Sequence, residues 1–137
     1  MTQKYLNELT HTIIGAAIDV HKELGPGLLE SIYEKCIAHL LREKGLNVVS
    51  QQKVPLVFRG LHLGCELRFD ILVADAVIVE IKAVDCLMPI HEAQLLTYMK
   101  LIGKPKGILI NFNCTNIFKE GQKTMVNEMF AKLPKGY

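Results

Sequence analysis

The chain has 137 residues, of which half are hydrophobic and 22% are charged. This length and composition fit one globular domain, residues 1–137, and exclude a disordered chain. The formal charge of 16 − 14 = +2 neither indicates nor excludes a nucleic-acid partner, because a basic patch can act within a nearly neutral total. No apolar run approaches the roughly 18 residues that span a bilayer, and no signal-peptide block opens the chain. We therefore expect a cytoplasmic protein with no membrane partner.

Two helices are expected first. Apolar residues recur at helical spacing from about Leu6 to Leu24, and the turn Gly25-Pro26-Gly27 ends this segment. A second amphipathic helix is expected from about Leu28 to Lys44, where Gly45 fits a C-terminal stop. The chain therefore begins with two helices joined by a short turn.

The middle of the chain is rich in β-branched residues and changes to a strand pattern. Pro55 cannot donate to a sheet, which indicates an edge strand or a bulge. Residues 74–76 are expected to form a hairpin loop between two of the strands. The expected strands are Val48 to Phe58, a short addition at Leu61 to Cys65, Phe69 to Val73, and Val77 to Val84.

The last third of the chain is expected to hold a helix from Pro89 to Ile102, a strand buried on both faces from Gly107 to Phe112, and a weakly helical tail from Glu120 to Lys132. The resulting order, α-α-β-β-β-α-β-α, predicts an α/β fold with a mixed sheet flanked by helices. The helix before the last strand permits a crossover, which would set that strand parallel to a neighbour.

Four charged residues stand within the apolar run from Phe69 to Val84, of which 12 of 16 residues are apolar. Asp75 is explained as a turn residue, which leaves three charges without a local explanation. If residues 74–76 form the loop, positions whose numbers sum to 150 pair, and Asp70 then lies opposite Glu80. Lys82 is two residues beyond Glu80 and points the same way. Two carboxylates and one ammonium group are therefore expected to converge in a mostly apolar neighbourhood.

Such a cluster needs a source of positive charge, because adjacent carboxylates repel. Lys82 can balance one negative charge, and a divalent cation such as Mg²⁺ or Mn²⁺, which prefers oxygen ligands, can balance the rest. The alternative is a partly buried structural ion pair with an exposed third charge. The residues of the cluster leave both interpretations open.

Two helices add polar residues to this region. His91, Gln94 and Tyr98 share one face of the helix from Pro89 to Ile102, and Gln94 and Tyr98 could present polar atoms to a site at the sheet edge. Glu30 lies close to the start of the second helix, where the alternative is a favourable charge at the helix dipole.

The pattern of Asp70, Glu80-Ile81-Lys82 and Gln94-x-x-x-Tyr98 resembles the PD-(D/E)XK nuclease superfamily in its RecB-like form. The segment from Gly27 to Tyr33 matches the pattern of the GxxExxY family, a branch assigned to that superfamily. The resemblance runs from about Ile13 to Phe112 and implies a restriction-endonuclease-like α-β-β-β-α-β core. One departure is Phe69, which stands where the superfamily is named for a proline.

The resemblance also implies roles for individual residues. Asp70, Glu80 and Glu30 would bind Mg²⁺ or Mn²⁺, and Lys82 would position or activate the attacking water and stabilise charge on the phosphate. Gln94 would orient site groups or nucleic acid. Supporting residues would be Tyr98, Tyr33 and His91.

The function expected from this set is metal-dependent hydrolysis of phosphodiester bonds in a nucleic acid, with DNA favoured over RNA. The alternative from another class is a catalytically silent nuclease-like fold that binds nucleic acid or protein. Histidine chemistry in a different enzyme is disfavoured, because the five histidines show no HxH or HExxH spacing. A homodimer is left open, since small nucleases often need a second subunit to span a duplex.

Six cations are candidate phosphate contacts, although a solvated surface is the favoured explanation for them. They are Lys53, Arg59, Arg68, Lys100, Lys104 and Lys106.

Overall fold

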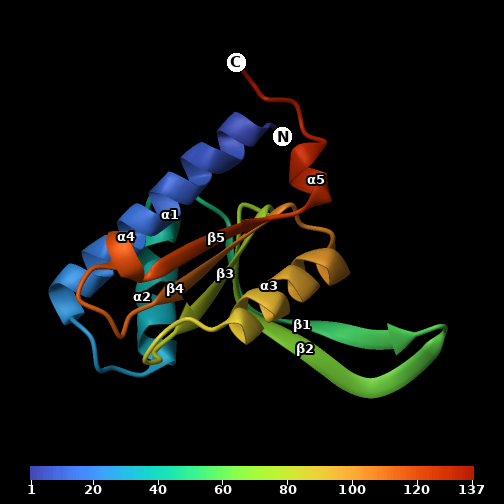
Figure 1. Ribbon diagram of the computed structural model, residues 1–137, viewed down its shortest axis with the longest axis horizontal. Helices are drawn as coiled ribbons and strands as arrows, with labels where there is room; N and C mark the ends of the chain where they lie inside the picture. Colours follow the sequence, from blue (N-terminus) through green and yellow to red (C-terminus); the bar gives the residue numbers. More distant parts are fainter.

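The computed structural model describes residues 1–137 as one sheet with helices on both faces (Figure 1). The five strands lie in the order β1-β2-β3-β4-β5. They are β1 (Val48–Phe58), β2 (Leu61–Val73), β3 (Val77–Lys82), β4 (Lys106–Asn111) and β5 (Gln122–Val126). The helices are α1 (Gln3–Leu24), α2 (Glu30–Glu43), α3 (Pro89–Ile102), α4 (Ile117–Glu120) and α5 (Glu128–Ala131).

The β2–β3 hairpin has the expected register, because Ile71 pairs with Val79 and Val73 pairs with Val77. The positions in each pair sum to 150, so the predicted loop at residues 74–76 is confirmed. β4 pairs with β3 in parallel, which confirms the crossover through α3. The two strands expected on either side of residues 66–68 form one continuous strand, β2.

Side chains that alternate along β3 separate the core into two layers. Val77, Val79 and Ile81 pack with the apolar faces of α1 and α2, and all three are at most 1% exposed. Ile78 packs on the other side of the sheet with Leu95 and other residues of α3. The helices therefore cover both faces of the central strands, as their continuous apolar sequence predicts.

Close packing of α3 on the sheet depends on Gly107 in β4. A Cβ at this position would lie 2.7 Å from Leu95 Cδ1 and 2.9 Å from Met99 Sδ. Glycine in a strand commonly marks such a close approach. The missing side chain of Gly107 therefore allows α3 to pack closely on the sheet, and this packing sets the position of the polar face of α3.

The prediction of a helical tail from Glu120 to Lys132 is wrong. Residues 122–126 form β5, which pairs antiparallel with β4, and only four-residue helices flank it. Without β5, the edge of β4 would leave backbone N–H and C=O groups without partners. The need to pair these groups overrides the weak local helical pattern.

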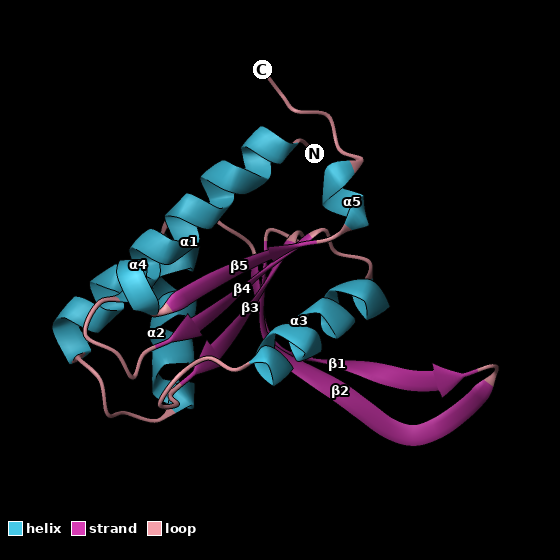
Figure 2. Ribbon diagram, viewed as in Figure 1, coloured by secondary structure: helices cyan, strands magenta, loops and turns pink.

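The far part of the β1–β2 hairpin projects from the body (Figure 2). We call residues 52–68 the arm, and none of them is buried. Its tip is the two-residue turn of Arg59 and Gly60, with φ angles of 49° and 84°, a turn in which left-handed backbone suits the twist of the strands. The register shifts between Pro55 and Val57 in the edge strand β1, so the prediction for Pro55 is confirmed.

No helix is both long enough and apolar enough to cross a membrane.

Candidate active site

Asp70 lies where β2 separates from β3. The pairing of the two strands ends at Ile71 and Val79. One residue further, Oδ2 of Asp70 accepts a hydrogen bond of 2.7 Å from the backbone N–H of Ile81. A side-chain oxygen therefore holds the two strands at this point, and the half-buried carboxylate lies in the fork between them. We call this region, with Glu80 and Lys82, the junction.

Glu80 lies on β3 beside Asp70 and is only 6% exposed. Its Oε1 atom is buried and has no hydrogen-bond partner. Burial is the first cause that raises its pKa to about 9, and the Asp70 charge adds to it, whereas the charge of Lys82 lowers it only in part. At pH 7 the Glu80 carboxyl therefore holds a proton unless a cation replaces it.

Lys82 is half-buried at the end of β3 and forms no ion pair. The alternative of a structural ion pair between Lys82 and a junction carboxylate is therefore not seen. Its ammonium group is close enough to influence the pKa of Glu80, yet it has no carboxylate partner within 4.0 Å.

Glu34 of α2, and not Glu30, lies next to Asp70. Glu34 is 8% exposed, and its Oε1 accepts a hydrogen bond of 2.7 Å from Nε2 of Gln51. The same nitrogen donates to Oδ1 of Asp70 at 3.2 Å. Burial raises the pKa of Glu34, and the charge of Asp70 raises it further, while the hydrogen bond from Gln51 lowers it.

Glu30 is tied to a different point. Its Oε2 accepts a hydrogen bond of 2.9 Å from the backbone N–H of Ala83, directly after β3. The structure therefore brings Asp70, Glu80 and Lys82 together and leaves Glu30 at the end of the strand. A role for Glu30 as a metal ligand stays a prediction.

Glu34 and Gln51 are the two residues that the sequence did not indicate. A signal existed for Glu34, because it falls within the buried stripe of α2 between Tyr33 and Ile37. A carboxylate in such a stripe is rarely buried without a partner. Gln51 gave no comparable signal, since glutamine is common in exposed strands.

The residues of α3 contribute unequally. Tyr98 is half-buried, and its pKa is raised by burial and by the charges of Glu80 and Asp70, so its hydroxyl lies near the junction. Gln94 is exposed. His91 caps its own helix, because its Nδ1 accepts a hydrogen bond of 2.9 Å from the backbone N–H of Met88. The three residues predicted on one face therefore divide between the junction, solvent and the helix start.

Tyr33 fixes the turn between α1 and α2. Its hydroxyl donates to the carbonyl of Gly25 at 2.6 Å and accepts from the N–H of Leu28 at 3.1 Å. Its ring stacks on Phe112, with centroids 4.1 Å apart. Together with the bond from Glu30 to the end of β3, these contacts fasten the α1–α2 turn to the sheet.

Two of the six candidate cations are not free for phosphate. Lys106 is 4% exposed and donates to Oδ1 of Asn7 at 2.7 Å, and burial lowers its pKa. Lys104 pairs with Asp75 at 2.8 Å. The other four of the six candidates are exposed to solvent: Lys53, Arg59 and Arg68 in the arm and Lys100 on α3.

No three Asp, Glu, His or Cys side chains gather closely enough to form a three-ligand metal centre. Mg²⁺ is commonly held by only one or two carboxylates, with water and substrate phosphate as the other ligands. The buried, unpartnered Oε1 of Glu80 beside the carboxylate of Asp70 matches this pattern. The junction therefore fits a hard divalent cation that completes its coordination with water and substrate.

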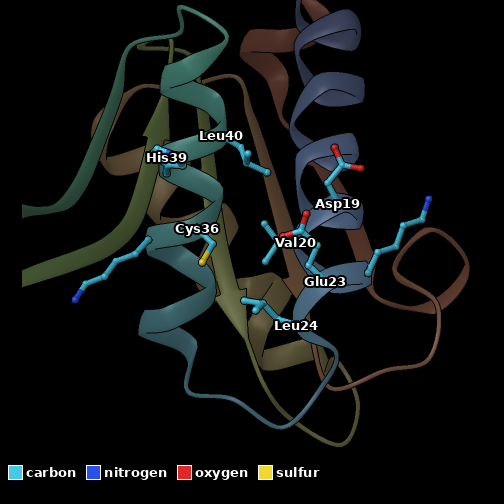
Figure 3. Close-up of a pocket in the computed structure, with 9 residues that line it drawn as sticks. Asp19, Val20, Glu23, Leu24, Cys36, His39 and Leu40 are labelled. Carbon is cyan, nitrogen blue, oxygen red and sulfur yellow. The ribbon is translucent and has the colours of Figure 1, made fainter.

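A groove of about 580 Å³ lies elsewhere, between α1 and α2 (Figure 3). Val20 and Leu40 give it apolar walls, and Asp19 and His39 lie on its exposed rim. It shares no residue with the junction, and its charged side chains are open to solvent.

The fold and the junction define a restriction-endonuclease-like α/β protein with an acidic site at the fork of two central strands. The family model of the PD-(D/E)XK nuclease superfamily matches residues 7–125, and the chain belongs to this superfamily. Searches among curated proteins and among solved structures gave no significant match.

Proposed function

We propose that this protein is a nuclease that hydrolyses phosphodiester bonds with Mg²⁺ or Mn²⁺ as cofactor, and that DNA is favoured over RNA as its substrate. Membership of the PD-(D/E)XK superfamily supports nuclease activity in general. The observation that carries the proposal is the buried, unpartnered oxygen of Glu80 beside Asp70. The Gly27, Glu30 and Tyr33 pattern supports placement in the GxxExxY branch.

A divalent cation bound by Asp70 and Glu80 would supply a Lewis acid and lower the pKa of a bound water. The chain itself holds the surrounding groups in place. Both oxygens of Asp70 accept hydrogen bonds, from Ile81 and from Gln51, so its carboxylate has a fixed orientation. The ammonium of Lys82 has no ion-pair partner and is available to stabilise negative charge that develops on a phosphate.

The segment after Lys82 is also held firmly. Asn111 on β4 is 3% exposed, and its amide donates to the carbonyl of Val84 at 2.9 Å and accepts from the N–H of Val84 at 3.1 Å. Glu30 holds the neighbouring Ala83. These bonds keep the end of β3 rigid, which supports a role for Glu30 in preorganising Lys82.

Three exposed cations of the arm support a polyanionic partner. Lys53 pairs directly opposite Arg68 in the β1–β2 register. Like charges in this arrangement destabilise a strand pair, and a phosphate backbone would neutralise them. Arg59 lies at the tip, with its guanidinium 5.4 Å from the centre of the Phe58 ring. A homodimer, which would present two such arms, stays part of the proposal.

A catalytically silent binding module is the second candidate. It is favoured because no three Asp, Glu, His or Cys side chains converge closely enough for a three-ligand metal centre. Such a protein would bind nucleic acid through the same arm without cleaving it.

The test incubates the purified protein with Mn²⁺ or Mg²⁺ and a panel of labelled single- and double-stranded DNA and RNA. We expect cleavage by the wild type and by Asp19→Ala, which removes an exposed carboxylate of α1, but not by Asp70→Ala. Circular dichroism checks that both variants fold. Binding without cleavage by the wild type would favour the second candidate, and cleavage that survives in Asp70→Ala would refute the site.

A further inference from the structure

Gln51 has an unusual backbone for a strand residue. Its φ angle is 54°, in the left-handed region that residues other than glycine rarely adopt. The other non-glycine residues with positive φ are Arg59, Ala74 and Asp75, and all three lie in hairpin turns. Among non-glycine residues, Gln51 alone has this conformation inside a strand, so the surrounding structure must hold it there.

The strained position lies directly across from Asp70. In the β1–β2 register Ser50 pairs with Ile71 and Gln52 pairs with Phe69, whereas Gln51 and Asp70, which lie between them, are not paired. The left-handed backbone therefore replaces a regular strand pair with a side-chain contact at this one point.

The side chain of Gln51 joins two carboxylates. Its Nε2 donates to Oε1 of Glu34 at 2.7 Å and to Oδ1 of Asp70 at 3.2 Å. Oδ2 of Asp70 is already held by the N–H of Ile81. Gln51 therefore supplies the second of the two donors that fix the plane of the Asp70 carboxylate, and Glu34 anchors the amide from α2.

We propose that Gln51 is a positioning residue, whose strained backbone aims its amide at Asp70 and holds that carboxylate ready for a divalent cation. This inference rests on the proposed function, since the cation is the one assigned to the junction. Partners that orient a ligating carboxylate typically change metal affinity about 10- to 100-fold when they are removed.

Three variants separate a positioning role of Gln51 from a purely structural one. Gln51→Gly removes the amide and relieves the left-handed backbone, because glycine adopts positive φ freely. The matched control, Gln52→Gly, introduces glycine at the adjacent exposed position of the same strand and leaves the Asp70 contact intact. Glu34→Gln keeps an oxygen acceptor for the Gln51 amide while it removes the charge of Glu34.

The experiment measures the Kd of Mn²⁺ by calorimetry and the metal-free melting temperature of each variant. We expect Gln51→Gly to bind Mn²⁺ about 10- to 100-fold more weakly than the wild type, with a metal-free melting temperature at least equal to that of Gln52→Gly. Gln52→Gly should bind Mn²⁺ within about threefold of the wild type, because it leaves the amide that orients Asp70 in place. Glu34→Gln should lose clearly less Mn²⁺ affinity than Gln51→Gly, because it keeps an acceptor for that amide.

Unchanged Mn²⁺ affinity in a folded Gln51→Gly variant would overturn the positioning role and leave the proposed nuclease intact. If Glu34→Gln loses Mn²⁺ binding as strongly as Gln51→Gly, Glu34 is itself a ligand, and its anchoring role is overturned. A wild type that binds no Mn²⁺ would overturn the metal site and the positioning role together.

Discussion

The two halves of β2 experience opposite environments within one strand. Leu61 and Leu63 in the arm are 61% and 47% exposed, whereas Ile71 and Val73 are completely buried. The arm half is paired only with β1, while the other half lies between helices on both faces of the sheet. Asp70 stands at the boundary between the two.

The boundary is where a carboxylate can be both accessible and strongly influenced by its neighbours. Toward the body, burial leaves Glu80 with an unpartnered oxygen and a raised pKa. Toward the arm, the strand pair carries exposed cations and no buried residue. Under the proposed function, the body end of the strand would carry the chemistry, and the arm end would bind a long substrate.

The largest effect is expected when the body end of the strand loses the positive charge of Lys82. Lys82→Ala should lower the cleavage rate on the order of 10²- to 10³-fold, because it removes a preorganised positive charge from the site. Metal-free stability should change little, since Lys82 forms no ion pair. Single-turnover cleavage measures the rate. Lys53→Ala in the arm is the control, and an equal loss in both variants would contradict the division between body and arm.

A smaller effect concerns the proton on Glu80. Its pKa is about 9 in the folded chain against an ordinary 4.5, so between these values the folded state holds a proton that the unfolded state has released. The stability of the metal-free protein should therefore fall as the pH rises from 6 to 8, by at most about 1.4 kcal/mol per pH unit from this group.

The side chain in Glu80→Gln cannot titrate. The free energy of unfolding of this variant, measured with urea at pH 6, 7 and 8, should therefore change clearly less with pH than that of the wild type. Mn²⁺ should stabilise the wild type more as the pH rises, because the cation replaces the proton, and should stabilise Glu80→Gln little. An equally steep pH dependence in the variant would show that another group, such as Glu34, carries it.

The central hairpin was accessible to sequence reasoning because its information is local. A three-residue loop and two runs of β-branched residues fix the register, and the register alone places Asp70 near Glu80. The crossover through α3 followed from element order, which is also local information.

The residues that were missed depend on how distant elements meet. Helical spacing shows that Glu30 and Glu34 share a face of α2, but only the packing of α2 on the sheet decides which one reaches Asp70. The left-handed φ of Gln51 accompanies contacts with Asp70 and Glu34, 19 and 17 residues away in the chain, which no local pattern reveals. β5 likewise forms because β4 needs a partner, a requirement that its own sequence does not express.

The smallest expected effect tests the arm end of the comparison. Lys53→Gln with Arg68→Gln removes two like charges that lie directly opposite each other, so metal-free stability should stay the same or rise by a few tenths of a kcal/mol. DNA binding should also depend less on salt. Each lost phosphate contact reduces the slope of the logarithm of the DNA-binding constant against the logarithm of the salt concentration by about 0.9, which gives a reduction of about 1.8 for the pair.

Duplex DNA binding, measured by fluorescence anisotropy at several salt concentrations, checks this slope, and calorimetry should show unchanged Mn²⁺ affinity. The control, Lys44→Gln with Lys132→Gln, removes two exposed lysines outside the arm and should leave the slope unaltered. Equal slopes for both double variants would mean that the arm does not contact phosphate. An altered slope together with unchanged Mn²⁺ affinity would show that the two halves of β2 act separately, since charge at one end would then serve binding without affecting the carboxylates at the other.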